Sequence, residues 1–319
     1  MKRKIGIIGL GDIAQKVYLP LLSANEKVEI AGLSSRSMST VDRIGAQYRI
    51  TGRYASLTDM LRQAKPEAVF VHSPTETHDT IVTTCLKEGI HVYVDKPLAY
   101  DIAASERMAA YAAERGLLLA VGFNRRFAPL YVQAKRWMEE GGGFDLVTAA
   151  KHRTKLQSHG AKKTLYDDLI HMLDLLLWLG GDAFDVASYR QRTDREGRLL
   201  FGAGTLTFGH GASASSSQDS AVAQFSMVRQ AGADLEQLEL HGSGRSAEVL
   251  NMETAVWRKT GAFPQEQTFG SWDTILHRRG FAAAVEHFLE CIADPSRCTI
   301  RADRTLPAHR LVEKLFPMK

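Results

Sequence analysis

The fold of the N-terminal half is set by residues 3–14, RKIGIIGLGDIA. The apolar residues 5–10 predict a short buried strand, and Gly9, Gly11 and Ala14 form a GxGxxA pattern where a helix should begin. Gly9 permits a tight turn, Gly11 lets the backbone approach a pyrophosphate, and Ala14 allows close packing of helix on strand. With Asp12 and Ile13, these residues predict a dinucleotide-binding loop.

Outward from this loop, strand and helix patterns alternate up to about residue 122. Short apolar runs such as VEIAGLSS, EAVFVHSP and HVYVDKP are separated by helical segments such as THDTIVTTCLKEG and DIAASERMAAYAAERG. Buried strands that alternate with helices predict a parallel sheet with helices on both faces. Residues 1–122 are therefore expected to form an α/β dinucleotide-binding domain of the Rossmann type.

The pattern changes after residue 122. Two helical segments, PLYVQAKRWMEEGGG and TLYDDLIHMLDLLLWLGG, precede strand-like stretches such as DVASYRQRT, GTLTF, QFSMVRQ and LEQLELHG. A late helix, FAAAVEHFLECIAD, carries an apolar stripe. Residues 123–319 are expected to form an α+β domain with a large, mostly antiparallel open sheet. That domain would bind substrate and support oligomerisation.

Composition excludes several classes of protein. The 319 residues are 45% hydrophobic and 24% charged, which is typical of a globular protein rather than a disordered chain or a membrane bundle. A net charge of +4 without clustered Lys or Arg does not indicate a nucleic-acid binder. The three cysteines are odd in number and form no CxxC pair, which argues against a disulfide framework and a structural zinc site and predicts a cytoplasmic protein.

The end of the second strand bears on the choice of cofactor. NAD-binding domains place an acidic residue here to bind the ribose 2′-hydroxyl. This chain has Ser34, Ser35 and Arg36 instead, and two hydroxyls with a guanidinium can hold a 2′-phosphate. The sequence favours NADP over NAD, although Arg36 could also be a solvated loop charge.

Two later strand ends should border the same crevice. Ser73 and Pro74 follow the third clear strand and are candidate contacts for the ribose or nicotinamide half of the cofactor, or caps of the next helix. The histidines nearby are interpreted as structural, and His78 is counted with the cofactor-binding residues. Asp95 and Lys96 lie at the next strand end, where a lysine could donate to a substrate oxygen.

Asp167, His171 and Asp174 share one side of a predicted helix. A carboxylate that orients an imidazole is a common arrangement for a general acid and base. A structural histidine and a helix-borne metal site are the alternatives. We expect no metal, because hydride transfer from a nicotinamide needs none.

Together these motifs resemble the Gfo/Idh/MocA oxidoreductases, named after glucose–fructose oxidoreductase, inositol dehydrogenase and a rhizopine-catabolism protein. The resemblance covers essentially the whole chain and is strongest to the MviM-type branch. It rests on residues 9–14, on Asp95-Lys96-Pro97, which is similar to the family's Glu-Lys-Pro, and on Asp167 with His171. Leu169 stands where the family often has Gly, which puts the shape of the pocket in doubt.

The resemblance implies specific roles. Lys96 would be the catalytic lysine beside the nicotinamide, His171 would exchange a proton with the substrate hydroxyl, and Asp167 would orient His171 or contact substrate. Asn124 and Arg125 would lie near the cofactor.

The expected function is NAD(P)-dependent hydride transfer to or from a secondary alcohol of a sugar, polyol or related compound. The alternatives are a non-catalytic NAD(P)-binding regulator and an enzyme that oxidises and re-reduces its substrate within one turnover. We also expect a homodimer or homotetramer joined through an apolar face of the second domain's sheet, and no nucleic-acid or membrane partner.

Overall fold

A computed structural model describes residues 2–209 and 221–316. The chain divides into two compact units: Met1–Phe123 with Ala284–Leu306, and Asn124–Ala283 with Pro307–Lys319. The contiguous division at residue 122 is therefore corrected in one respect. A late segment, Ala284–Leu306, belongs to the first unit, and local sequence patterns carry no signal for such a return.

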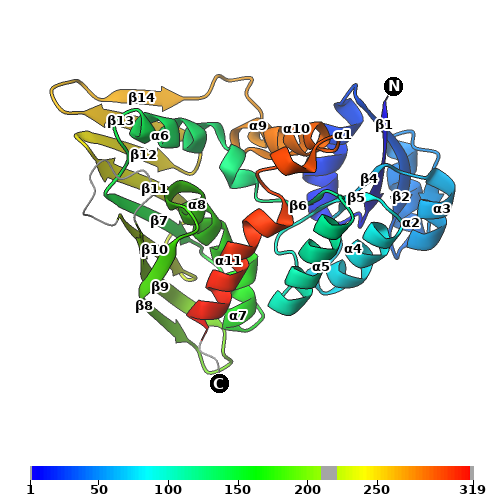
Figure 1. The fold of residues 1–319 in the computed structure, drawn as a ribbon, viewed down its shortest axis with the longest axis horizontal. Coiled ribbons are helices and arrows are strands. Elements are labelled where there is room, and N and C mark those ends of the chain that lie inside the picture. Colours follow the sequence, from blue (N-terminus) through cyan, green and yellow to red (C-terminus); the bar gives the residue numbers. More distant parts are fainter. Residues whose placement is uncertain (1, 210–220, 317–319) are drawn as a thin grey trace. The chain divides into compact units, whose positions relative to one another are not determined.

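The first unit contains a parallel six-stranded sheet in the order β3-β2-β1-β4-β5-β6 (Figure 1). This is the strand order of dinucleotide-binding domains, and the order reverses between β1 and β4, where such sheets open a crevice at their carboxyl ends. The predicted Rossmann-type sheet is confirmed. Its strands are β1 (Arg3–Ile8), β2 (Val28–Ser34), β3 (Arg53–Tyr54), β4 (Ala68–Val71), β5 (His91–Val94) and β6 (Leu119–Val121).

Helices of the first unit begin and end at residues suited to those positions. The Asp101 side chain accepts hydrogen bonds from the backbone amides of Ala103 and Ala104 and so caps α5. Pro20 lies in the first turn of α1, just after a π-helical turn, Ala14–Tyr18, where a proline is tolerated. The helices are α1 (Leu19–Ala24), α2 (Met38–Gln47), α3 (Leu57–Ala64), α4 (His78–Lys87) and α5 (Ile102–Glu114).

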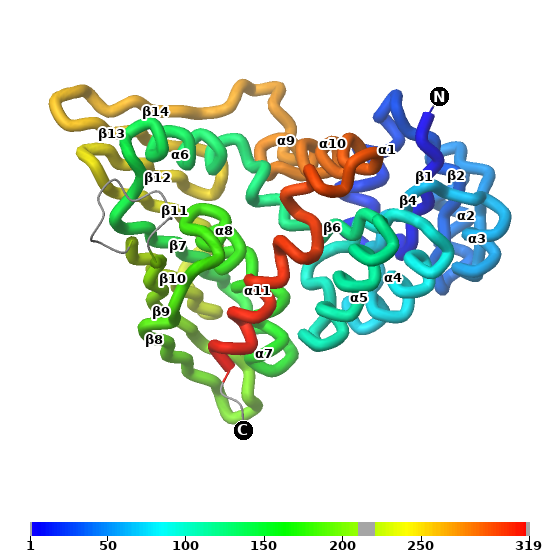
Figure 2. The backbone as a smooth tube through the Cα atoms, viewed as in Figure 1, coloured from blue at the N-terminus to red at the C-terminus, as the bar shows by residue number. Residues whose placement is uncertain are grey.

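The returning segment completes the core of the first unit. In α10 (Phe281–Cys291), Phe288 is fully buried, with its ring centroid 5.3 Å from that of Phe70 and 5.4 Å from that of Tyr93. The backbone amide of Val121 also donates to the carbonyl of Ile300 at 2.9 Å. Figure 2 shows this segment in orange beside α1. The dinucleotide-binding core is thus built from both ends of the chain.

The second unit contains an eight-stranded sheet in the order β14-β13-β12-β11-β7-β10-β9-β8. Neighbouring strands are antiparallel except β7 and β10, so the predicted mostly antiparallel sheet is confirmed. Its strands are β7 (Leu146–His152), β8 (Phe184–Thr193), β9 (Leu199–Phe208), β10 (Val222–Val228), β11 (Leu235–Gly242), β12 (Arg245–Leu250), β13 (Thr254–Lys259) and β14 (Gln265–Thr268).

Helices cover one face of this sheet (Figure 1). They include α6 (Pro129–Glu139) and α8 (Ile170–Gly180), which follows a π-helical turn (Leu165–Leu169). The second unit also contains α7 (Ala161–Thr164), α9 (Ile275–Arg278) and most of α11 (Ala302–Leu315). Buried residues alternate with half-exposed ones along β7, as expected for a sheet covered on one side.

The opposite face differs in part from the sequence expectation. We expected alternate apolar residues there. The central strands place apolar residues there at Leu146, Val222, Val228 and Leu235. The other positions are mostly small or polar: Thr148, Ala150, Gln224, Ser226, Gln237 and Glu239. In the described part of the chain, no helix combines the length and apolar character needed to span a membrane.

Candidate functional site

The glycine loop follows β1 and is held between the ends of β2 and β4. The backbone amide of Gly9 donates to the carbonyl of Ser34 at 2.8 Å. Gly9 has a φ of +86°, and a Cβ built there would lie 2.5 Å from the backbone nitrogen of Ser73. Only glycine fits this close approach without strain.

At Gly11, packing does not require a glycine. A Cβ at Gly11 would meet nothing within 4 Å, so the position faces open space rather than packed backbone. The carbonyl of Gly11 accepts from the amide of Gln15 at 3.1 Å as the helix begins. A helix start with free space beside its first glycine fits the pyrophosphate of a dinucleotide.

A cavity of about 710 Å³ opens at this loop, bordered by residues that follow β1, β2 and β4. Its size suits a nucleotide-type ligand. It brings together these predicted cofactor-binding residues: Gly9, Gly11, Asp12, Ile13, Ser34, Ser35, Arg36, Ser73 and Pro74. Ala14 is buried, as its predicted packing role requires. Among the described residues that line the cavity near the end of β2, Arg36 is the charged one, and it is exposed.

Asp95 is fixed by buried neighbours. Its Oδ2 lies 2.8 Å from Nδ1 of His72, and the His72 ring stacks on Tyr18 with centroids 3.9 Å apart. Burial alone would raise the pKa of Asp95, but the charge of His72 and hydrogen bonds from His72 and Tyr18 outweigh it, and the pKa is lowered. Asp95 is therefore ionised at the end of β5, and the structural role of His72 stays a prediction, supported by its contacts with Asp95 and Tyr18.

His78 ties two loops of the first unit together. Its Nδ1 lies 3.0 Å from the carbonyl oxygen of Pro97, and its Nε2 lies 3.0 Å from the carbonyl oxygen of Ser73. Burial is the main cause that lowers the pKa of His78. His78 therefore lies behind the cavity wall, where it can shape the site through Ser73. The half-buried Lys96 is joined to Pro97 by a cis peptide bond in the turn that His78 holds.

In the second unit, His171 is buried on α8 with 8% of its surface exposed. Asp167, on the preceding π-helical turn, lies with its Oδ2 3.0 Å from Nε2 of His159. Asp174 forms two hydrogen bonds with the Arg126 guanidinium, at 2.9 and 2.6 Å. Asp174 is therefore part of a buried ion pair, and His159 is a partner of Asp167 that the helical spacing did not indicate.

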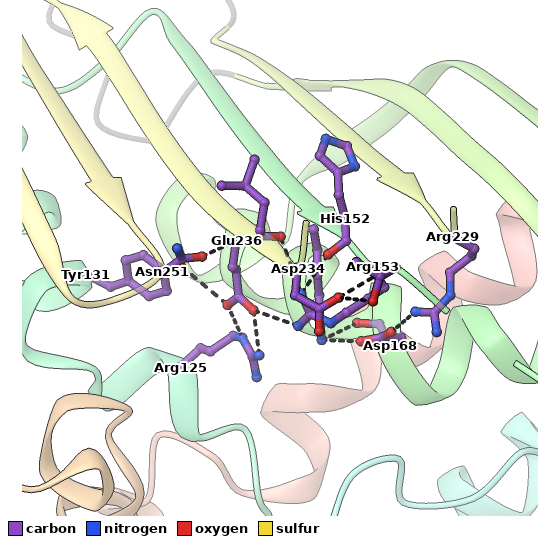
Figure 3. Close-up of polar contacts among 12 residues, drawn as sticks. Arg125, Tyr131, His152, Arg153, Asp168, Arg229, Asp234, Glu236 and Asn251 are labelled. Atoms are coloured by element: carbon purple, nitrogen blue, oxygen red, sulfur yellow. Dashed lines mark hydrogen bonds and ion pairs between the residues drawn. The ribbon is translucent and has the colours of Figure 1, made fainter. Parts of the chain in front are cut away.

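Arg125 also differs from its expected environment. Its guanidinium forms a paired interaction with the carboxylate of Glu236 on β11 (Figure 3). Asn124 donates to the carbonyl of Arg279 at 2.8 Å. Both contacts lie within the second unit, and a role for these residues in cofactor binding stays a prediction.

Two profiles of known families match the chain. The first, described as an oxidoreductase family with an NAD-binding Rossmann fold, matches residues 3–123, and the YceM-like C-terminal domain matches residues 129–260. The YceM protein of Salmonella typhimurium is 35% identical over 315 residues, which are 98% of this chain and 97% of that protein. The chain belongs to the Gfo/Idh/MocA family of NAD(P)-binding oxidoreductases.

Other members support this membership over different lengths. The crystal structure of the dehydrogenase MviM from Clostridium difficile has a TM-score of 0.89 and 31% identity, and the match covers 99% of each chain. An inositol 2-dehydrogenase from Paracoccus denitrificans is 30% identical over 193 residues, which are 58% of this chain and 56% of that protein.

Several charged residues of this Gfo/Idh/MocA member were not predicted from sequence as site residues. Asp168, Arg229 and Glu236 are buried. Each lies in a different segment, and an isolated charge in a strand or helix is ordinarily solvated. The available signal was Glu236 at an inward-facing position of a β-strand with Leu238 and Leu240.

The sequence motifs also did not indicate a second group of potential metal ligands. His287, Cys291 and Cys298 place ligand atoms within 4.8 Å of one another in the first unit. The cysteines are seven residues apart, so a search for CxxC does not find them. Burial raises the pKa of the Cys298 thiol to about 12, which favours the neutral thiol.

Proposed function

We propose that this protein transfers a hydride between NADP and a secondary alcohol of a sugar, polyol or related compound. The observation that carries the proposal is the cavity of the first unit, in which the Gly9 turn, the open position at Gly11 and the Arg36 loop surround one space. The similarity to an inositol 2-dehydrogenase supports the sugar or polyol class.

When bound, the nicotinamide accepts a hydride from the carbinol carbon or returns it. The substrate hydroxyl then has a proton to lose, and His171 is the proposed base, since an imidazole has an ordinary pKa near neutrality. Lys96 is proposed as the group that stabilises negative charge on the substrate oxygen by a hydrogen bond. Oxidation gives a ketone, a reduced nicotinamide and a proton on His171. Asp167 is proposed as a positioning residue for His171.

The test begins with calorimetric titration of NADP(H) and NAD(H). A panel of sugars and polyols is then screened for an absorbance change at the nicotinamide band. Tight NADP(H) binding with turnover of a panel member supports the proposal. Binding of the cofactor with no turnover of any panel member would favour a regulatory role. The proposed compartment is the cytoplasm, since Cys85, Cys291 and Cys298 are free thiols.

A further inference from the structure

Four basic side chains meet on the helix-covered face of the second unit's sheet, near the carboxyl end of β7. We call them the cationic cluster: Arg125, Lys151, Arg153 and Arg229. Three of the four are buried, with 7%, 2% and 4% of the surface of Arg125, Lys151 and Arg229 exposed. Figure 3 shows Arg125 and Arg153 reaching toward Glu236, and Arg229 reaching toward Asp168.

Both carboxylate oxygens of Glu236 already have donor partners. Arg125 binds both carboxylate oxygens, Nη2 of Arg153 lies 3.5 Å from Oε2, and the Tyr131 hydroxyl lies 3.4 Å from Oε1. Burial would raise the pKa of Glu236, but the charge of Arg125 and its hydrogen bonds lower it to about 2. The single negative charge of Glu236 is therefore shared by two guanidinium groups.

Asp168 is shared in the same way. One carboxylate oxygen pairs with Lys151 and the other with Arg229. Burial opposes ionisation, but Lys151 and then Arg229 lower the pKa of Asp168 to about 2. Both carboxylates of the cluster are thus ionised at neutral pH, and each is already divided between two cations.

Positive charge remains in excess. Within these ion pairs of the described residues, four cations share two carboxylates, an excess of two. Asp234 lies beside Arg153 in Figure 3, but it is exposed and its Oδ1 accepts from the amide and hydroxyl of Thr154. Counting its charge still leaves an excess of one.

Arg229 also has one donor group without a partner in the described part of the chain. Its Nε is buried and has no hydrogen-bond partner among the described residues. A buried guanidinium that lacks a partner for one N–H is destabilising, and a structural ion-pair network needs no surplus cations. The surplus is explained if an anion joins the cluster.

We propose that the cationic cluster binds an anionic oxygen group, a carboxylate or a phosphate, carried by the sugar or polyol substrate. Guanidinium groups present paired N–H donors that match both anions. This inference rests on the proposed function and narrows its substrate class from neutral sugars to sugar acids or sugar phosphates.

The experiment compares matched neutral and anionic compounds on the NADP-saturated protein. The set is D-glucose, D-glucuronate and D-glucose 6-phosphate, with myo-inositol and a myo-inositol monophosphate. Binding is measured by calorimetry, and hydride transfer by nicotinamide absorbance. We expect at least one anionic compound to bind ~10-fold or more tightly than its neutral partner, and the acid and phosphate arms identify which anion is preferred.

Arg229→Gln is the decisive variant, and Arg258→Gln, which alters an exposed pair with Glu248, is its matched control. Arg229→Gln should weaken anion binding ~10-fold or more and leave NADP affinity unchanged. Arg258→Gln should change neither. If Arg229→Gln does not fold, Arg153→Gln alters a less buried member of the cluster.

The outcomes separate the two proposals. Neutral compounds bound as tightly as anionic ones, or anion affinity unchanged in a folded Arg229→Gln or Arg153→Gln variant, would overturn the anion site. Turnover of neutral compounds alone would overturn it and leave hydride transfer standing. Anion binding that requires Arg229 without any turnover would support the site and count against hydride transfer. Absence of both binding and turnover would count against both.

Discussion

The proposed chemistry depends on two individual side chains, Lys96 and His171. His171→Ala and Lys96→Ala should each lower turnover ~100-fold or more, the usual scale for a lost acid or base group. Cofactor affinity should be nearly unchanged in His171→Ala, because the glycine loop holds the pyrophosphate. Steady-state kinetics and calorimetry measure both. His241→Asn, at an exposed site on β11, is the matched control. Near-normal turnover in His171→Ala would show that this histidine is not the base.

Arg36 determines the expected cofactor preference. It is exposed at the rim of the cavity, where a 2′-phosphate can reach it. We predict that the protein binds NADP(H) more tightly than NAD(H). Arg36→Ala should remove most of that difference by weakening NADP(H) binding and leaving NAD(H) binding nearly unchanged. Calorimetry with both cofactors checks this, and tighter NAD(H) binding by the unmodified protein would contradict it.

Glu236 links stability to pH. Its pKa is about 2 in the folded protein and 4.5 ordinarily, so its stabilisation is complete above about pH 4.5 and is lost as the pH falls toward 2. Glu236→Gln should cost about 3–5 kcal/mol at pH 7, because Arg125 is left buried without its partner. The difference from the unmodified protein should shrink between pH 4.5 and 2. Urea unfolding measures this, with the exposed Glu248→Gln as control. A difference that does not change with pH would rule out the linkage.

At the scale of elements, the glycine loop offers a matched pair of substitutions. Gly9→Ala places a methyl group 2.5 Å from the backbone of Ser73 at a φ of +86°, so it should destabilise the fold by at least ~2 kcal/mol. Gly11→Ala meets no atom within 4 Å and should leave stability within ~0.5 kcal/mol. It should nevertheless weaken NADP binding ~10-fold or more, because the methyl group enters the space proposed for the pyrophosphate.

Thermal unfolding and calorimetry on the two variants separate these effects. Equal destabilisation by both substitutions would mean that Gly11 is needed for folding rather than for the ligand. Full cofactor affinity in Gly11→Ala would place the pyrophosphate elsewhere.

Sequence patterns predicted some helices and strands of this fold and not others. The apolar strands and the helical segments between them predicted the parallel sheet and its major helices, because those signals are local. The short strand β3 and helix α2 were not predicted, since two residues of strand and a polar helix give weak periodicity. The partners of Asp168 and Glu236 could not be found in this way. Arg229 is 61 residues from Asp168, and Arg125 is 111 residues from Glu236.

The candidate site was predicted more completely in the first unit than in the second. A glycine loop fixes neighbouring residues by backbone geometry, so Gly9, Gly11 and the ends of β2 and β4 could be assigned from spacing. The helical spacing of Asp167 and His171 did not reveal His159, because that contact comes from the loop before α7.

At the scale of the whole molecule, the open face of the second unit's sheet is expected to join copies of this chain. Its apolar members Leu146, Val222, Val228 and Leu235 are half-exposed or exposed, and covering them with a second copy would bury apolar surface. We predict a homodimer or homotetramer at micromolar concentration. Thr148→Arg, at an outward position of the central strand β7, should shift it toward monomer. The control is Thr58→Arg on the exposed surface of α3. Light scattering that gives a monomer for the unmodified protein would refute the prediction.

The return of residues 284–306 to the first unit has a consequence for biosynthesis. A ribosome delivers β1 to β6 first, then about 160 residues of the second unit, and only then Phe288, which packs on Phe70 and Tyr93. The rings of Phe70 and Tyr93 therefore lack this partner until residue 288 has been synthesised, so the first unit can complete its folding only late in translation. A truncated chain of residues 1–123 would keep the glycine loop but expose these rings, which makes it a natural substrate for chaperones rather than an independent module.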